Sequence, residues 1–156
     1  MKNLHKQFGA TLLCLCATML APLAWAGERG SAEEAIAMVK KAVASIEKNG
    51  REKAFAEFND PKNADFHDRD LYIFVYDMNG VNVSHGVNPK LIGKNLLDMK
   101  DTDGKPIIRG FIDAAKAKGK GWYDYKWPNP VTKAIEQKSA YIEQSGDLIV
   151  GSGIYK

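Results

Sequence analysis

The fold is decided by the stretch Leu71-Tyr72-Ile73-Phe74-Val75-Tyr76-Asp77, in which nearly every residue is β-branched, aromatic or otherwise apolar. Residues of these types favour β-strands. Because side chains alternate between the two faces of a strand, one face carries an aromatic set and the other an aliphatic set, namely Tyr72, Phe74 and Tyr76 against Leu71, Ile73 and Val75. The pattern predicts a strand that is buried on both faces.

A hairpin and a long loop are predicted next. Turn residues Met78-Asn79-Gly80 follow the strand, and alternation resumes from Val81 to His85. Residues 86–105 are rich in Gly, Asn, Asp and Pro, so they predict a connection with at most one short turn. A connection of this length inside a compact domain is often a binding loop.

Helices are predicted on both sides of this hairpin in the sequence. Ser31-Ala32-Glu33-Glu34 has the pattern of a capping box, and apolar residues then repeat at intervals of three and four up to Asn49-Gly50. A shorter helix is expected around Phe55 and Phe58, and another opens at Pro106. Strands are expected at about 121–127, 134–143 and 147–155. This order predicts an α+β domain, an antiparallel sheet with helices on one side.

The predicted strand at 121–127 is aromatic on one face. It reads Trp122-Tyr123-Asp124-Tyr125-Lys126-Trp127, and alternation places Tyr123, Tyr125 and Trp127 side by side. Phenol and indole rings can bury an apolar body while they offer hydrogen bonds at the rim, which suits a small-molecule pocket. Ordinary core packing is the alternative for each ring.

Residues 1–26 have the organisation of a secretory signal peptide. Lys2 and Lys6 precede an apolar run from Phe8 to Leu23, and Ala24-Trp25-Ala26 has the spacing that signal peptidase recognises. Cleavage there leaves residues 27–156 as one domain, expected in the periplasm. The uncharged stretch 7–27 is also long enough to cross a bilayer, so an uncleaved anchor is the alternative.

The composition excludes several classes of function. The two cysteines lie within residues 1–26, so the remaining domain has no disulfide. Without Lys2 and Lys6 the chain has 20 basic and 19 acidic side chains, a net charge of +1, which does not favour nucleic acid as a partner.

Catalysis and metal binding are not expected either. The histidines of the predicted domain, His67 and His85, do not form a ligand-spaced pair. Asp101-Thr102-Asp103-Gly104 is followed by Lys105-Pro106 rather than by the rest of a calcium loop, so it predicts a turn. No nucleophile motif or carboxylate pair stands out. We therefore expect no cofactor, no metal and no enzyme activity.

Six segments, taken in order, resemble the single Cache domain type 2 family: 71–77, 84–85, 91–96, 125–128, 138–141 and 150–155. The similarity covers nearly all of residues 27–156. It implies a PAS-like antiparallel sheet of five to six strands, with a long N-terminal helix and a crossover helix. Domains of this family occur outside the cytoplasm in chemoreceptors, in sensor kinases and as free-standing secreted proteins, and related domains bind small organic acids.

The resemblance, together with the aromatic pattern, indicates a candidate ligand site. Trp127, Tyr125 and Tyr123 would shape the cavity, and Tyr72 and Tyr76 would form its floor unless they are plain core. Lys138 would neutralise a carboxylate, with a solvated strand lysine as the alternative. His85, otherwise structural, would add a hydrogen bond. Tyr141 ranks below Lys138, because a spacing of three sends the two side chains to opposite faces unless a bulge intervenes.

Two functions follow as expectations. The first is binding of a short carboxylate of two to four carbons, without chemistry, by a domain that ends soon after its last strand and passes its bound state to a receptor or kinase partner. The second is a ligand-free interaction module of the cell envelope. In either case the apolar stripe of the N-terminal helix packs on the sheet or on a second copy in a homodimer.

Overall fold

The computed structural model describes residues 29–156. The signal peptide predicted for residues 1–26 lies outside this range. The elements, in chain order, are α1 (Ala32–Asn49), α2 (Arg51–Asn59), β1 (His67–Asp68), β2 (Leu71–Tyr72), β3 (Phe74–Asp77), β4 (Asn82–His85), the short 3-10 helix η1 (Pro89–Leu91), α3 (Ile108–Lys118), β5 (Lys120–Pro128), β6 (Ile135–Ser145) and β7 (Leu148–Tyr155). Within residues 29–156, the helices are all too short or too polar to cross a bilayer.

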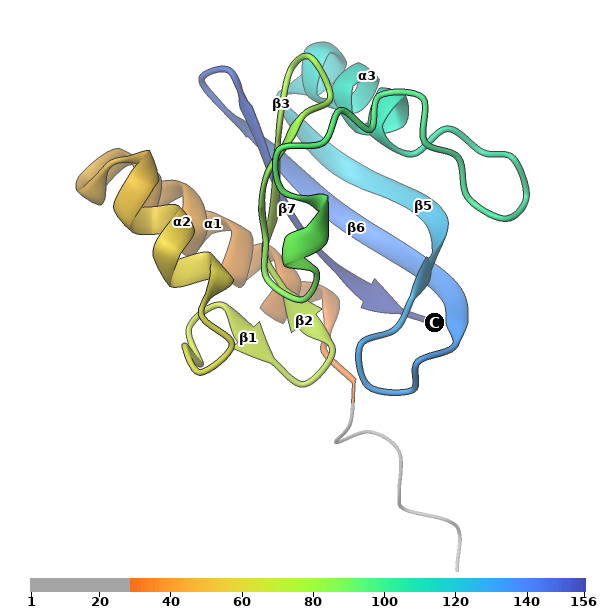
Figure 1. The fold of residues 1–156 in the computed structure, drawn as a ribbon, viewed down its shortest axis with the longest axis horizontal. Coiled ribbons are helices and arrows are strands. Elements are labelled where there is room, and N and C mark those ends of the chain that lie inside the picture. Colours follow the sequence, from red (N-terminus) through yellow and green to blue (C-terminus); the bar gives the residue numbers. More distant parts are fainter. Residues whose placement is uncertain (1–28) are drawn as a thin grey trace, which may run out of the picture.

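Five strands form one antiparallel sheet in the order β4-β3-β7-β6-β5. The long crossover between β4 and β5 carries η1 and α3, as Figure 1 shows. The α+β class, the antiparallel sheet, the long N-terminal helix and the crossover helix are confirmed.

The predicted strand at 71–77 is divided in two. Leu71 and Tyr72 pair with β1 in a separate two-stranded ribbon, and only Phe74–Asp77 joins the main sheet. The reason is the length of β4, whose pairing with β3 begins at His85 opposite Phe74. Residues before Phe74 extend past the end of β4 on that side, so β1 supplies their hydrogen bonds.

Helix α1 begins and ends as its sequence predicts. The Ser31 hydroxyl accepts from the Glu34 N–H at 3.2 Å, and the Glu34 carboxylate accepts from the Ser31 N–H at 2.8 Å. Gly50 ends the helix at φ 79°, a conformation that favours glycine.

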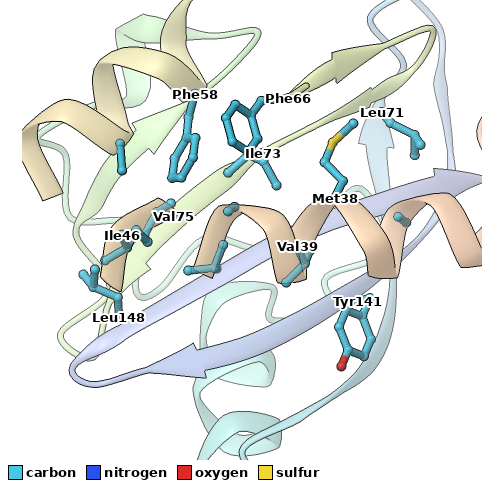
Figure 2. Close-up of a cluster of buried hydrophobic side chains, with 14 residues drawn as sticks. Met38, Val39, Ile46, Phe58, Phe66, Leu71, Ile73, Val75, Tyr141 and Leu148 are labelled. Atoms are coloured by element: carbon cyan, nitrogen blue, oxygen red, sulfur yellow. The ribbon is translucent and has the colours of Figure 1, made fainter. Parts of the chain in front are cut away.

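One face of the sheet is covered by α1 and α2. The aliphatic side chains Leu71, Ile73 and Val75 point to this side and are buried against the helices, as Figure 2 shows. The stripe of α1 packs on the same cluster, with Ala35, Val39 and Ala42 fully buried. The apolar stripe that we considered for homodimer pairing is therefore covered by the sheet.

The opposite face is covered by α3 and the long loop before it. Ile108, Phe111, Ile112 and Ala115 of α3 pack on an aromatic layer that contains Tyr72, Phe74, Tyr76 and Tyr125. The expectation that all helices lie on one side of the sheet is therefore wrong. Both faces of β3 are apolar, so each face needs its own cover to leave water.

Candidate ligand-binding site

The aromatic layer beneath α3 encloses a small chamber. Phe111 of α3 stacks on Phe74 of β3 with ring centres 5.4 Å apart, and the Tyr125 ring of β5 meets Phe111 edge-on, also at 5.4 Å. The chamber has a volume of about 10 Å³, close to the smallest that holds one water molecule. Its lining consists of Tyr72, Phe74, Tyr76, His85, Ile107, Phe111, Tyr125 and Trp127.

A larger groove of about 610 Å³ lies directly outside the chamber. Its walls come from residues 86–89 of the long loop, from residues 127–130 and 133 at and after the end of β5, and from the end of α2. His85 and Trp127 line both spaces, and their ring centres are 6.3 Å apart. These two side chains are therefore the shared wall between chamber and groove.

His85 is held as a neutral hydrogen-bond donor. Its side chain is buried, with the Tyr72 ring 5.2 Å away, and its Nδ1 accepts from the Asn88 N–H at 3.2 Å. A neutral imidazole that accepts at Nδ1 carries its proton on Nε2. Burial, and next the positive charge of Lys138, lower the pKa of His85 to about 3.

Lys138 of β6 is fully buried, so the solvated alternative is wrong. Its side chain crosses β7 above Gly153, where an added Cβ would lie 2.9 Å from the lysine Cε. Its Nζ lies 4.0 Å from the centre of the Tyr72 ring and donates to the Tyr155 hydroxyl at 3.3 Å. Burial lowers the pKa of Lys138 to about 7, and the charge of Asp70 opposes that shift.

The ammonium borders the chamber through the Tyr72 ring rather than lining it. An ammonium has three N–H donors. Within residues 29–156, the Lys138 ammonium makes one hydrogen bond, the one to Tyr155, and its other favourable contacts are with the faces of aromatic rings. In its protonated form, which its pKa of about 7 favours below neutral pH, Lys138 is thus a buried cation with unused N–H donors beside an apolar cavity.

Sequence reasoning missed Tyr155. Its hydroxyl donates to the Pro128 carbonyl oxygen at 2.8 Å, accepts from Lys138 and lies 3.5 Å from the Tyr72 hydroxyl. The Tyr155 hydroxyl therefore connects the lysine to the end of β5. Alternation along β7 puts Gly151, Gly153 and Tyr155 on one face, a pattern that could have indicated space for the lysine followed by its partner.

The structure brings together most of the predicted site residues. Tyr72, Tyr76, His85, Tyr125 and Trp127 line the chamber, and Lys138 borders it.

Two predicted residues lie outside the chamber wall. The Tyr123 ring packs over Gly110 of α3, and its hydroxyl donates to the Pro106 carbonyl at 2.6 Å. Tyr141 lies on the opposite face in the cluster beneath α1, where Figure 2 labels it, and its hydroxyl donates to the Glu143 carboxylate at 3.0 Å. The register is regular from Lys138 to Tyr141, so no bulge brings both to one face.

Comparisons with known proteins match this architecture. The sequence pattern of the family described as single Cache domain 2 matches residues 14–156. A methyl-accepting chemotaxis protein from Vibrio parahaemolyticus has a similar structure, with 32% identity and a TM-score of 0.69, over 79% of this chain and 86% of that one. A Cache chemosensory domain, described for its recognition of carboxylic acid, has 25% identity and a TM-score of 0.67, over 79% and 91%.

A longer relative is the sensor histidine kinase MctS of Rhizobium johnstonii, 38% identical over 89 residues. The match covers 56% of this chain and 19% of the kinase, so the chain spans only about a fifth of that relative. The family pattern matches nearly the whole chain, and the solved relatives share its sheet and helices. The chain therefore belongs to the single Cache domain 2 family, which consists of extracytoplasmic ligand-binding sensor modules rather than enzymes.

Proposed function

We propose that this domain binds a small carboxylate of two to four carbons in the periplasm and does not transform it. The observation that carries the proposal is the buried Lys138 ammonium beside the aromatic chamber. A buried cation with unused N–H donors favours an anion, and an anion in an apolar cavity needs such a partner. The Nε2–H of His85 supplies a second donor in the chamber wall.

The size of the chamber sets a condition on binding. A volume of about 10 Å³ holds one water, whereas a carboxylic acid needs several times more. The ligand would enter from the outer groove and displace the Trp127 and His85 side chains, which separate groove from chamber. The aromatic rings would then surround the short apolar tail and limit its length.

The relatives support this proposal through the classes of protein to which they belong and through the ligand that is named for one of them. One is described for carboxylic acid recognition, and others are a chemoreceptor and a sensor kinase. We infer that this domain likewise serves signal transduction, with a receptor or kinase partner that reads its bound state. Delivery to the periplasm by a cleaved signal peptide is part of the same proposal.

Calorimetric titration of the folded full chain with acetate, propionate, lactate and pyruvate tests the proposal. We expect heat of binding with at least one acid, and an affinity about 30-fold weaker or more in Lys138→Met, because the ligand anion would lose its buried partner. Lys126→Met is the matched control, since Lys126 of β5 pairs with Asp103 at the surface. Tyr141→Phe should also bind normally, because Tyr141 faces α1. No heat with any of the four acids would overturn the proposal.

A further inference from the structure

The outer groove has features that the passage of a small acid into the chamber does not need. Its volume of about 610 Å³ lies in the range of about 300–1,000 Å³ that is typical of small-molecule sites. Apolar side chains form much of its wall, namely Pro61, Val87, Pro89, Trp127, Pro128 and Pro130. Val87 among them is 41% exposed. The groove therefore offers an uncovered apolar surface to a ligand that is too large for the chamber.

The charges around the groove favour an anion. Among the described residues that line it, Lys133 is the single lysine or arginine, and none is an aspartate or a glutamate. Glu136 accepts from the Asn129 side chain at 3.0 Å, but Glu136 does not line the groove and it pairs with Arg29 at 3.1 Å. An anion in the groove would therefore meet the exposed Lys133 ammonium without a competing carboxylate in the wall.

Asn59, at the end of α2, adds a hydrogen-bond donor whose orientation is fixed. Its side-chain oxygen accepts from the Ser84 hydroxyl at 2.9 Å and from the His85 N–H at 3.0 Å. These two bonds identify the oxygen end of the amide, so its other end is the NH₂ group. Within residues 29–156 this NH₂ group has no hydrogen-bond partner, and it is accessible rather than buried. Because Asn59 lines the groove, its NH₂ group can donate to an oxygen of a ligand there.

The backbone of Lys133 has a conformation that normally selects glycine. Its φ is 63°, and its N–H donates to the Asn129 carbonyl at 2.9 Å within the loop between β5 and β6. A residue with a Cβ has a steric cost in this region, and residues held there are frequent at functional sites. Glycine would serve the turn at lower cost. The turn by itself therefore gives no reason for a lysine side chain, whereas an anion in the groove does.

We propose that the outer groove is a second binding site, which takes a monocyclic aromatic carboxylate such as benzoate. The aromatic ring lies against Trp127 and the proline rings, and the carboxylate pairs with Lys133 and accepts from the Asn59 NH₂ group. This site goes beyond the proposed function, because it does not depend on acid binding in the chamber. Its ligand covers the wall that His85 and Trp127 form between the two spaces.

A peptide strand from a partner protein suits the groove less well than a small molecule. Such a strand needs free backbone groups at the edge of a sheet. On β4, the edge strand beside the groove, the Asn82 N–H donates to the Lys94 carbonyl at 3.0 Å, and the Asn82 carbonyl accepts from the Gly93 N–H at 2.7 Å. The His85 N–H donates to Asn59. These groups are already paired, so we assign the groove to a small molecule.

NMR titration of the full chain with benzoate, and with benzyl alcohol as its uncharged counterpart, tests the second site. We expect the largest shifts of backbone signals at Val87 and around Trp127. Benzoate should bind about threefold to tenfold more tightly than benzyl alcohol, because only benzoate pairs with Lys133. No shifts with benzoate would overturn the proposal. Shifts centred on Ile107 and Phe111 would also overturn it, since these residues line the chamber and not the groove.

Lys133→Gly removes the positive charge without straining the turn. Glycine readily adopts a φ of 63°, so the free energy of unfolding in urea should stay the same or rise. Benzoate should then bind no more tightly than benzyl alcohol. An unchanged preference for benzoate in Lys133→Gly would overturn the proposal, because the lysine would have no part in recognition.

Two exposed valines provide a matched test of location. Val87→Asp puts a carboxylate into the groove wall, so it should weaken benzoate binding about threefold or more. Val131→Asp adds the same charge at a valine that is 50% exposed and does not line the groove, so it should have a smaller effect. Equal losses of benzoate affinity in the two variants would overturn the groove site. Heat of binding with acetate but no groove binding would leave the proposed function intact, and the reverse would leave the groove site intact.

Discussion

The two faces of the central sheet are built from the same strands and yet differ in chemistry. On the α1 side, β2, β3 and β7 present aliphatic residues such as Leu71, Val75 and Val150. On the α3 side, the alternate residues of the same strands are aromatic or small apart from Ile149, and the polar groups of His85 and Lys138 are buried among them. The α1 face is mainly aliphatic, with Tyr141 among its buried side chains, whereas the α3 face buries His85 and Lys138 beside a chamber.

This difference shows how one sheet separates stability from recognition. Aliphatic side chains pack without leaving polar atoms to satisfy, so the α1 face can contribute stability alone. Tyrosine, tryptophan and histidine bring polar atoms into the core, and each needs a partner or a ligand. On the α3 face such polar atoms are buried around the chamber, where Lys138 donates to the Tyr155 hydroxyl.

The largest effect that we expect is a loss of folding stability in acid, and it should begin on the α3 face. The pKa of His85 is about 3 in the folded protein against about 6.5 in an unfolded chain, because burial disfavours its charged form. Between these values the unfolded state binds a proton that the folded state does not. The stability from neutral His85 is therefore present above pH 6.5 and is lost as the pH falls towards 3, by roughly 5 kcal/mol in total.

Urea unfolding at several pH values between 7 and 4 measures this loss. His85→Gln cannot titrate, so its free energy of unfolding should fall less steeply with acid than that of the unaltered protein. Parallel pH curves for the two proteins would contradict the assignment of His85 as a buried neutral side chain.

Truncation on the α1 face should lower stability and leave recognition intact. Ile73 is fully buried beneath α1, so Ile73→Ala should reduce the free energy of unfolding by about 3 kcal/mol. Ile135→Ala is the control, since that isoleucine is 56% exposed and should change stability by less than about 0.5 kcal/mol. Where Ile73→Ala remains folded, any ligand affinity should be unchanged. A large loss of affinity would show that the two faces are not separate.

A methyl group added to β7 on the α3 face should lower the free energy of unfolding by less than Ile73→Ala does. An added Cβ at Gly153 would lie 2.7 Å from the Ser139 carbonyl oxygen and 2.9 Å from Lys138 Cε, so Gly153→Ala should cost about 2 kcal/mol and displace the lysine. Gly121→Ala on β5 is the matched control, because no heavy atom lies within 4 Å of an added Cβ there. Equal stabilities of the two variants, measured by urea unfolding, would contradict the packing of Lys138 over Gly153.

Much of this architecture could be predicted from short-range patterns. The capping box of α1, the hairpin around Gly80 and the split of Leu71–Tyr76 into two faces depend on neighbouring residues, and the structure confirms each of them. The same alternation correctly placed Tyr125 and Trp127 on one face, and both line the chamber. Spacing also indicated that Lys138 and Tyr141 part to opposite faces.

Other features depend on partners far away in the sequence. The division of the first strand follows from where β4 ends, and the position of α3 on the second face follows from which surface remained uncovered. The local sequence does not single out Asp70, and only the fold brings Gly30 to one of its carboxylate oxygens and buries the other. The alternation of Gly151, Gly153 and Tyr155 indicates space beside Tyr155, but only the fold brings Lys138 and Pro128 to the Tyr155 hydroxyl.

By itself, the sequence determined the elements and the chemical character of each face, because hydrophobic period and capping act over a few residues. Only the tertiary structure decided which polar groups became buried together and how much room they left. Burial raises or lowers a pKa according to everything packed around a group, and the rings around the Lys138 ammonium come from β2, β3 and β7 at once. That convergence across the sheet turned a strand lysine into the buried cation of a candidate ligand site.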